Sequence, residues 1–345
     1  MSKQSSLSDN ELDVLIVEKS RKILERFEQV AILHVKDANL LKILNSVMKY
    51  WSSSRSKSRD LIRPALTAFS CEAVGSDPEE AEDAGLLFTL ASSGFGIHDD
   101  ILDRSSKKHL RETILGLHGI DGALLVGDLL IVKAWSILGE MIRKNHDPMK
   151  IVEIIKEYCK FSVEVCEAEL METRCRRNLE KDVEYYLNLL WQAMAETEAC
   201  SKIGAIIGDG RPEEVEALAQ FGRRLGFTYR LADDIQDCLN IKGDLLHRLE
   251  YESIPFPILY AAKASTEDFL RISRIVKKAK IEPSDIKKLL ELCFETEAFE
   301  YGRKIAKENV RINETHLSSL RPSEARQVLS SLNERAYKRI LELCV

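Results

Sequence analysis

Helical periodicity runs through nearly the whole chain, and no other feature of the sequence restricts the fold as strongly. In most long segments, apolar residues recur three and four positions apart rather than at alternate positions. Glycine (16) and proline (8) are sparse among the 345 residues, which argues against a many-stranded sandwich or barrel. The sequence therefore predicts an all-α, single-domain protein built as a large helical bundle.

Capping residues and helix breakers set the expected helix boundaries. Ser8 or Asp9 can cap the first helix, with Glu11 in its first turn, and the stretch from Asp209 to Pro212 stops one helix and starts the next. Helices are expected at about 11–35, 38–51, 62–75, 78–103, 117–145, 149–173, 180–208 and 212–241. Shorter helices are expected over 256–345, broken near Pro283 and Pro322.

Charge and cysteine content exclude several classes of function. The chain has 50 Lys and Arg against 56 Asp and Glu, a net charge of -6, which argues against nucleic-acid binding. The eight cysteines show no CxxC pair or zinc-ligand spacing, so we expect reduced core thiols in a cytoplasmic protein. The N-terminal residues lack the apolar run of a signal peptide, and the apolar stretch Gly122–Gly139 is interrupted by Asp128 and Lys133. That stretch predicts a buried helix rather than a transmembrane segment.

The first of two acidic motifs reads Asp99-Asp100-Ile101-Leu102-Asp103. On a helix, Asp99 and Asp103 lie one turn apart on the same face, where their carboxylates repel each other unless a cation lies between them. Mg²⁺ suits such a pair, because it binds a couple of carboxylates and completes its shell with water and phosphate oxygens. The alternative interpretation is an acidic cluster on a helix surface. The preceding residues from Leu86 to Ile97 are apolar or small, which argues against a surface helix.

The same pattern returns at Asp233-Asp234-Ile235-Gln236-Asp237, again after a largely apolar run. Two such motifs on long helices are hard to explain as surface clusters. If the helices face each other, their carboxylates can hold Mg²⁺ ions against a diphosphate. With an apolar wall below, this arrangement suits ionisation of an allylic prenyl diphosphate, with the carbocation shielded from water.

From about Arg63 to Ala261, the chain resembles the trans-isoprenyl diphosphate synthase (polyprenyl synthetase) family. The resemblance rests on Arg63-Pro64, His98 to Asp103, Gly127-Asp128, Gly226 with Asp233 to Asp237, and Pro257 with Ala261. It implies an all-helical fold of the isoprenoid synthase type, a homodimer, and two aspartate motifs that face each other through Mg²⁺.

The resemblance also implies a metal site and a domain plan. Asp99, Asp103 and Asp233 are expected to hold the metal, and Asp100, Asp234 and Asp237 are the remaining expected ligands. Three Mg²⁺ ions are expected when the substrate diphosphate is bound. One domain is expected over residues 1–345: N-terminal helices and a basic loop in 1–60, the catalytic core in 61–265 and C-terminal helices in 266–345.

Several cationic positions of the family are changed in this chain. Asp60 stands where a lysine is expected, Ser92 replaces a histidine, and Lys108-His109 replaces paired arginines. A carboxylate beside a diphosphate turns attraction into repulsion, so the site for the second, non-allylic diphosphate is expected to be weakened. Lys57 or Arg59 can substitute if the loop is shifted.

Three interpretations follow from this pattern. The leading one is a terpene synthase of the prenyltransferase-derived type (class IB), which ionises one C15–C20 allylic diphosphate and then cyclises it or eliminates a proton. The alternative is a chain-elongating prenyltransferase whose basic loops, Arg55–Arg59 and Arg104–Arg111, bind isopentenyl diphosphate in a different way. A third is a non-catalytic partner subunit, against which the two complete motifs argue.

The substrate is expected to contact cations at the mouth of the site and apolar residues below it. Arg230, three residues before Asp233, is expected to bind the diphosphate or, equally, to pair with a neighbouring Asp. The other cations expected to bind substrate are Lys108, Arg63 and Arg111. The residues expected to line the hydrocarbon pocket are Phe95, Ala91 and Phe88 below the first motif and Tyr229 and Leu225 opposite, with room left by Gly94 and Gly96. Ordinary core packing is the alternative for each aromatic residue.

Overall fold

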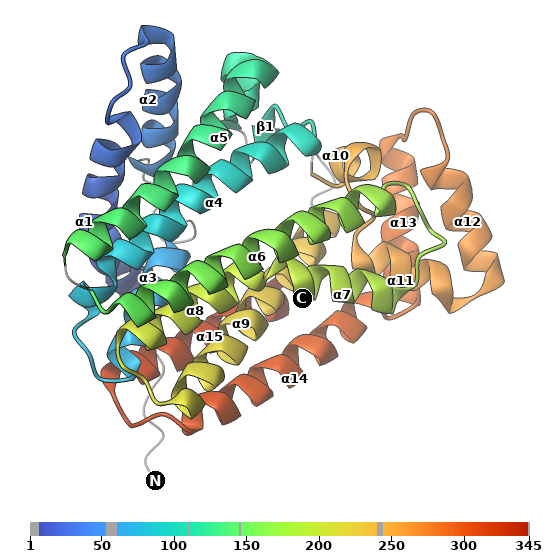
Figure 1. Cartoon of the computed structure of the whole chain (residues 1–345). Helices are drawn as coiled ribbons and strands as arrows, with labels where there is room; N and C mark the ends of the chain where they lie inside the picture. The colour runs from blue at the N-terminus through green and yellow to red at the C-terminus, as the bar shows by residue number, and fades with distance from the viewer. Residues whose placement is uncertain (1–6, 53–60, 109–110, 145, 240–243, 344–345) are drawn as a thin grey trace. The chain divides into compact units, whose positions relative to one another are not determined.

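The computed structural model describes residues 7–52, 61–108, 111–144, 146–239 and 244–343, and there it confirms the all-α prediction (Figure 1). The helices are α1 (Asp9–Ile32), α2 (Ala38–Ser52), α3 (Ile62–Ala73), α4 (Glu82–Leu102), α5 (Ile114–Arg143), α6 (Pro148–Cys175), α7 (Val183–Ala193), α8 (Ala195–Ile207), α9 (Pro212–Leu239), α10 (Asp244–Tyr251), α11 (Phe256–Ala264), α12 (Thr266–Val276), α13 (Pro283–Glu295), α14 (Ala298–Ser318) and α15 (Glu324–Leu343). A short 3-10 helix, η1 (Pro78–Ala81), precedes α4, and strands β1 (Lys107–Lys108) and β2 (Arg111–Glu112) form an antiparallel hairpin.

Local signals placed most helix ends where the structure has them. Ser8 and Glu11 form a capping box at the start of α1, with the Ser8 amide donating to the Glu11 carboxylate at 2.8 Å. Pro283 begins α13, as its fixed φ and missing N–H favour. The helix predicted over 180–208 is two helices, because the backbone leaves helical geometry at Met194. The hairpin from Lys107 to Glu112 was not predicted, because that stretch was assigned to an irregular basic loop.

The chain divides into two compact units, each assembled from separate segments. Unit 1 comprises Met1–Cys159, Thr197–Gly222 and Leu317–Ser331, and unit 2 comprises Lys160–Glu196, Arg223–His316 and Leu332–Val345. These boundaries do not coincide with the predicted divisions after residues 60 and 265. That residues 1–345 form one domain stays a prediction.

In unit 1, α4 is the central helix and packs most extensively on α5, with α1 and α3 also against it. Gly94 allows the close approach: a Cβ there would lie 2.6 Å from the Gly127 carbonyl oxygen and from the Ile131 side chain. The expectation that Gly94 leaves room for substrate is therefore wrong, because α5 fills that side. Gly96 has no atom within 4 Å of a Cβ position, so its side of α4 is open.

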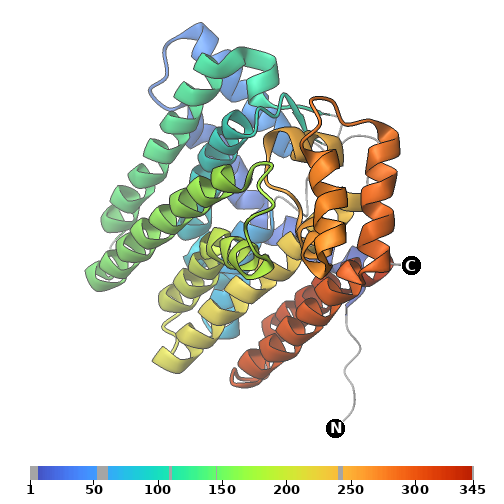
Figure 2. The same ribbon diagram turned by 90° about the vertical axis from the view of Figure 1, so that its right-hand side faces the viewer.

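In unit 2, a hydrophobic core joins α11 to its neighbours α7, α12 and α13 (Figures 1 and 2). Tyr186 of α7, Ile235 of α9 and Phe256 of α11 are buried in it. Gly302 of α14 lies against the Phe256 ring and the Ile235 side chain. This core fixes the C-terminal half of α9, which carries the second aspartate motif.

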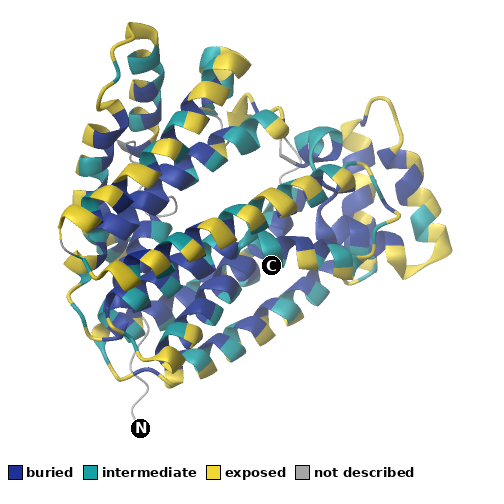
Figure 3. Ribbon diagram, viewed as in Figure 1, coloured by how far each residue is buried: buried dark blue, intermediate teal, exposed yellow. Residues whose placement is uncertain are grey.

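The helix predicted to be buried over Gly122–Gly139 lies within α5, but much of its apolar surface is exposed (Figure 3). The exposed large apolar residues of α5 are Leu117, Ile120, Leu124, Leu125, Val132, Trp135 and Ile142. The prediction of burial is therefore wrong for most of the helix, since one face of α5 lacks a partner among the described residues. By length and composition, α5 also passes the test for a bilayer-spanning helix, a weak indication because core helices pass it too.

Most cysteines are core residues, as predicted. Cys71, Cys175, Cys200, Cys238 and Cys293 are buried free thiols, and burial raises the pKa of Cys71 to about 12. Cys159 and Cys166 are instead exposed, both on α6. Cys344 lies outside the described residues.

We predict that Gly94→Ala destabilises the protein by about 1–3 kcal/mol, because the added methyl overpacks the contact between α4 and α5. Gly96→Ala is the matched control on the same helix and should stabilise it slightly, since alanine favours a helix. Midpoints of urea or thermal unfolding at fixed protein concentration measure both effects. Equal midpoints for the two variants would contradict the assigned packing of Gly94.

Candidate active site

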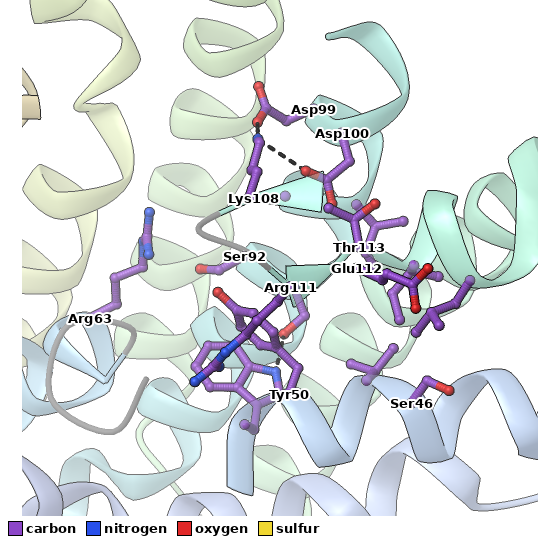
Figure 4. Close-up of a pocket in the computed structure, with 17 residues that line it drawn as sticks. Ser46, Tyr50, Arg63, Ser92, Asp99, Asp100, Lys108, Arg111, Glu112 and Thr113 are labelled. Atoms are coloured by element: carbon purple, nitrogen blue, oxygen red, sulfur yellow. Dashed lines mark hydrogen bonds and ion pairs between the residues drawn. The ribbon is translucent and has the colours of Figure 1, made fainter. Parts of the chain in front are cut away.

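The first aspartate motif lies at the C-terminal end of α4, in unit 1, and a lysine bridges two of its carboxylates. Lys108 Nζ lies 2.7 Å from Asp99 Oδ2 and 3.0 Å from Asp100 Oδ1 (Figure 4). Burial by itself would lower the pKa of Lys108, but the attraction of Asp99 and Asp100 outweighs it and raises that pKa. Asp103 is buried and caps the end of α4. The carboxylates of Asp99 and Asp100 are therefore stabilised by a positive charge, which Lys108 supplies.

The β-hairpin carries Lys108 back over the end of α4. The chain leaves the helix through Arg104, whose φ of 54° reverses its direction. Thr113 then ties the hairpin to this turn, because its hydroxyl donates to the Ser105 carbonyl oxygen at 2.6 Å. This local geometry explains how a residue nine positions after Asp99 reaches its carboxylate.

A pocket of about 250 Å³ lies beside the motif, entirely within unit 1 (Figure 4). Among the described residues, Arg63, Lys108 and Arg111 are the cations of its wall, so these three predicted residues lie together. We call its apolar part the apolar floor, which comprises Val47, Trp51, Ile97, Ile114 and Leu117. The Trp51 indole is held in place by donating to Ser93 Oγ at 3.0 Å. Such a pocket suits a ligand with an anionic head and a short hydrocarbon tail.

The face of α4 that lines this pocket differs from the predicted one. Ser92, Ser93 and Gly96 line it, whereas Phe88 and Ala91 are fully buried in the core. Phe95 is partly buried and is not among the pocket residues. The prediction missed α2, which supplies part of the apolar floor, because no local pattern indicates where this helix packs. Asp60 lies outside the described residues.

The second aspartate motif, on α9 in unit 2, is bound by a buried arginine that sequence reasoning missed. Arg248 Nη1 donates to Asp234 Oδ1 at 2.7 Å and to Asp237 Oδ2 at 3.1 Å. Asp234 Oδ2 accepts from the Tyr186 hydroxyl at 2.8 Å and from the Phe256 amide at 3.1 Å. Asp234 is 0% exposed and both its oxygens are engaged, so its predicted role as a metal ligand is not supported by this geometry.

Further polar groups complete this buried cluster. Arg248 Nη2 donates to the Tyr186 hydroxyl at 3.0 Å, and the Ser253 hydroxyl donates to Glu172 Oε1 at 2.6 Å. Burial would lower the pKa of Arg248, but Asp234 and the other surrounding anions raise it well above its ordinary value. Burial also raises the pKa of the Asp237 carboxyl, although Arg248 opposes this. No sequence spacing links these residues, because they come from separate helices and a loop.

Asp233, the first residue of the motif, faces the C-terminal helix. Arg339 Nη2 of α15 donates to Asp233 Oδ1 at 2.7 Å and to Gln236 Oε1 at 2.5 Å. Arg339 was also missed, because it lies about a hundred residues further along the chain.

The other predicted residues of α9 occupy different surroundings. Arg230 lies 3.7 Å from Glu172, so it forms an ion pair as one alternative expected, but with a glutamate instead of an aspartate. The Tyr229 hydroxyl accepts from Arg335 Nε of α15 at 3.3 Å. Leu225 is buried. Contact of these residues with a substrate stays a prediction.

Metal binding at either motif has to rely on few protein ligands. Among the described residues, no group of three or more His, Cys, Asp or Glu side chains is arranged to hold a metal ion. Asp99 and Asp100 nevertheless share a cation in Lys108, so this pair is suited to positive charge. One or two carboxylates with phosphate and water oxygens are what Mg²⁺ commonly takes. The donor set therefore fits Mg²⁺, while the facing of the two motifs stays a prediction because they lie in different units.

We predict that Asp234→Asn lowers stability by about 3 kcal/mol or more, because it removes one partner of a buried ion pair. Asp99→Asn, at a partly exposed pair, should change stability by less than about 1 kcal/mol. Urea unfolding of the metal-free protein measures both. A stable Asp234→Asn variant would show that Arg248 does not need this carboxylate.

Comparisons with known proteins identify the family of the chain. The family profile "Polyprenyl synthetase" matches residues 41–293 of the chain. A short chain isoprenyl diphosphate synthase from Methanothermobacter thermautotrophicus is 27% identical over 284 residues, which cover 81% of this chain and 86% of that protein.

Solved structures share the fold. Geranylgeranyl pyrophosphate synthetase from Pyrococcus horikoshii Ot3 is 24% identical and superimposes with a TM-score of 0.82, covering 95% of this chain and 98% of its own. A polyprenyl synthase from Caulobacter crescentus CB15, complexed with calcium and isoprenyl diphosphate, is 17% identical with a TM-score of 0.76, covering 97% and 99%. The expected isoprenoid synthase fold is confirmed, and the family match extends over most of the sequence. The chain therefore belongs to the polyprenyl synthetase family and is an enzyme that processes isoprenoid diphosphates.

Proposed function

We propose that the chain is a Mg²⁺-dependent isoprenyl diphosphate synthase, which condenses isopentenyl diphosphate with an allylic prenyl diphosphate. The observation that carries the proposal is the pocket beside the first motif, where Arg63, Lys108 and Arg111 lie around the apolar floor. The class IB terpene synthase interpretation is not supported, since the matched relatives are named as prenyl diphosphate synthases. This favours the alternative of a chain-elongating prenyltransferase.

The three cations bear directly on the choice between elongation and cyclisation. Elongation needs cationic side chains for a second diphosphate, in addition to those that hold the first. The substitutions at Asp60 and Ser92 led us to expect that this second set was lost. The hairpin, however, brings Arg111 into the same pocket as Arg63, with Ser92 in the wall. We propose that these two arginines bind isopentenyl diphosphate and that the apolar floor receives its five-carbon group.

The allylic diphosphate is proposed to bind beside Asp99 and Asp103. Bound Mg²⁺ would neutralise the charge that develops on the diphosphate as the allylic carbon–oxygen bond breaks. Lys108 would exchange its contacts with Asp99 and Asp100 for the diphosphate, since a metal ion at these carboxylates satisfies their need for positive charge. The solved structure from Caulobacter crescentus is complexed with calcium and isoprenyl diphosphate, which supports the use of a divalent cation together with this class of substrate. Three ions remain our proposal for the number bound.

We propose an allylic substrate or product of C15–C20 length. The matched structure from Pyrococcus horikoshii is named as a geranylgeranyl pyrophosphate synthetase, which supports the longer end of this range. Phe95, one turn before Asp99, stays the residue proposed to limit chain length. Phe88 and Ala91 are set aside as pocket residues, because both are fully buried in the core of unit 1.

The decisive assay supplies the purified protein and Mg²⁺ with C10–C20 allylic diphosphates, with and without isopentenyl diphosphate. We expect longer prenyl diphosphates to form only when isopentenyl diphosphate is present. Hydrocarbon or alcohol formed without it would instead identify a terpene synthase, and no turnover under either condition would contradict a catalytic role.

Arg111→Gln should raise the KM for isopentenyl diphosphate about tenfold or more, because it removes charge-assisted hydrogen bonds to the diphosphate. Lys107→Gln is the matched control, since Lys107 lies on the same hairpin with its side chain exposed. Its KM should stay within about twofold of the wild type. Equal effects of the two substitutions would remove Arg111 from the proposed site.

We also propose that the protein is a homodimer, and that the exposed apolar face of α5 is part of its interface. Exposed apolar residues of this size usually contact a partner when they form a continuous face. On α6, the exposed residues Met149, Val152, Cys159, Val163, Cys166 and Leu170 recur with the three- and four-residue spacing of a helix–helix contact. The Trp135 and Tyr158 rings, 4.9 Å apart, join α5 to the first half of α6. A second copy of the chain is the partner that the family expectation favours.

We predict that Val132→Lys converts the dimer into a monomer, because it places a charge in an apolar interface. Val14→Lys is the matched control: Val14 on α1 is 64% exposed, as is Val132, but lies outside the proposed interface. Size-exclusion chromatography with light scattering measures the mass of each variant. The rate of thiol labelling at Cys159 and Cys166 should rise only in Val132→Lys. A monomeric wild-type protein would contradict the proposal.

We propose a cytoplasmic location for the protein. Five of its cysteines are buried as free thiols, which is typical of proteins from a reducing compartment.

A further inference from the structure

Two helices of unit 2 meet in a matched register at the second aspartate motif. On α9, Tyr229 and Asp233 are four residues apart, and on α15 so are Arg335 and Arg339. Arg335 Nε donates to the Tyr229 hydroxyl, and one turn further along Arg339 Nη2 donates to Asp233 Oδ1. Each arginine therefore has a defined position on α9, and Arg339 contacts an aspartate of the motif.

The two arginines that contact the motif, Arg248 and Arg339, differ in burial. The Arg248 side chain is 3% exposed and bonds to Asp234, Asp237 and the Tyr186 hydroxyl at once. Removing it would leave buried carboxylates without a counter-charge, so Arg248 is a permanent part of the fold. The Arg339 side chain is 24% exposed and its partner Asp233 is 21% exposed. Hydration can replace that ion pair with only a small loss of free energy, so the Arg339 guanidinium can move away from Asp233.

Arg339 and a metal ion would compete for the same place. The guanidinium lies 2.7 Å from Asp233 Oδ1, within the distance at which a metal bound to that oxygen would repel it. Asp234 has both oxygens engaged, and Asp237 is paired with the buried Arg248, whereas the cation on Asp233 is the partly exposed Arg339. The arginine on Asp233 is therefore the group that incoming metal has to displace.

We propose that Arg339 is a competing cation that occupies the metal-binding side of Asp233 and sets the divalent-metal concentration that the second motif requires. When metal and diphosphate bind, the guanidinium leaves Asp233, and the C-terminal turn of α15 loses one of its contacts with α9. Arg339 acts on the metal through Asp233 and is a positioning residue. The inference rests on the proposed role of Asp233 as a metal ligand.

The test measures metal binding directly, without turnover. Mn²⁺ is titrated into the full chain in the presence of inorganic pyrophosphate, and binding is followed by electron paramagnetic resonance and calorimetry. Arg339→Gln should lower the half-saturating Mn²⁺ concentration about two- to fivefold, the range that a partly exposed ion pair supports. Arg326→Gln is the matched control, because Arg326 is a partly buried arginine of the same helix that donates to the Leu320 carbonyl oxygen at 2.9 Å. It should leave the half-saturating Mn²⁺ concentration unchanged. Arg339→Lys keeps the positive charge and should also leave this concentration close to the wild-type value.

The other outcomes separate the inference from the proposed function. If Arg339→Gln raises the half-saturating concentration, or shifts it no more than Arg326→Gln does, the competition is overturned and Arg339 merely docks α15. A purely structural role would lower the thermal midpoint of both variants without separating their metal affinities. Asp233→Asn should lose part of the Mn²⁺ binding. If it binds Mn²⁺ as the wild type does, the proposed role of Asp233 fails, whatever Arg339 does.

Discussion

The repulsion between neighbouring carboxylates is the constraint on which the candidate site depends. Each aspartate motif places acidic groups one turn apart or side by side on a helix, and such groups are stable only beside positive charge. The chain supplies it from elsewhere in the fold: Lys108 at Asp99 and Asp100, Arg248 at Asp234 and Asp237, and Arg339 at Asp233. The hairpin, α10 and the end of α15 are thereby tied to the helices that carry the motifs.

Burial divides these cations into permanent and exchangeable ones. Arg248 is enclosed with its partners, so the carboxylates it neutralises belong to the framework of unit 2. Lys108 and Arg339 remain partly exposed, and we propose that a metal ion takes their place, because solvent compensates the displaced charge. The chemistry of the two motifs thus follows from which carboxylates stay accessible rather than from how many aspartates the sequence contains.

The pocket shows where sequence reasoning reached its limit. Arg63, Lys108 and Arg111 were identified from charge and family resemblance, and they do lie together. Phe88 and Ala91, expected to line the wall below them, are instead fully buried, because helical spacing does not say which face of α4 is covered by its neighbours. Gly94 was interpreted as leaving space for substrate, although α5 packs closely against it, whereas Gly96, two residues further on, is open. Packing partners decide such questions, and they come from distant parts of the chain.

The sequence by itself determined the all-α class, most helix boundaries and the two aspartate motifs, because periodicity, caps and breakers act over a few residues. The tertiary structure alone decided that Asp234 is engaged with Arg248 and Tyr186, that Asp233 is paired with Arg339, and that one face of α5 is exposed. The physical reason is the sequence distance between interacting residues. Whether a carboxylate is free to bind a metal depends on its burial and on counter-charges from distant parts of the chain, which no local pattern encodes.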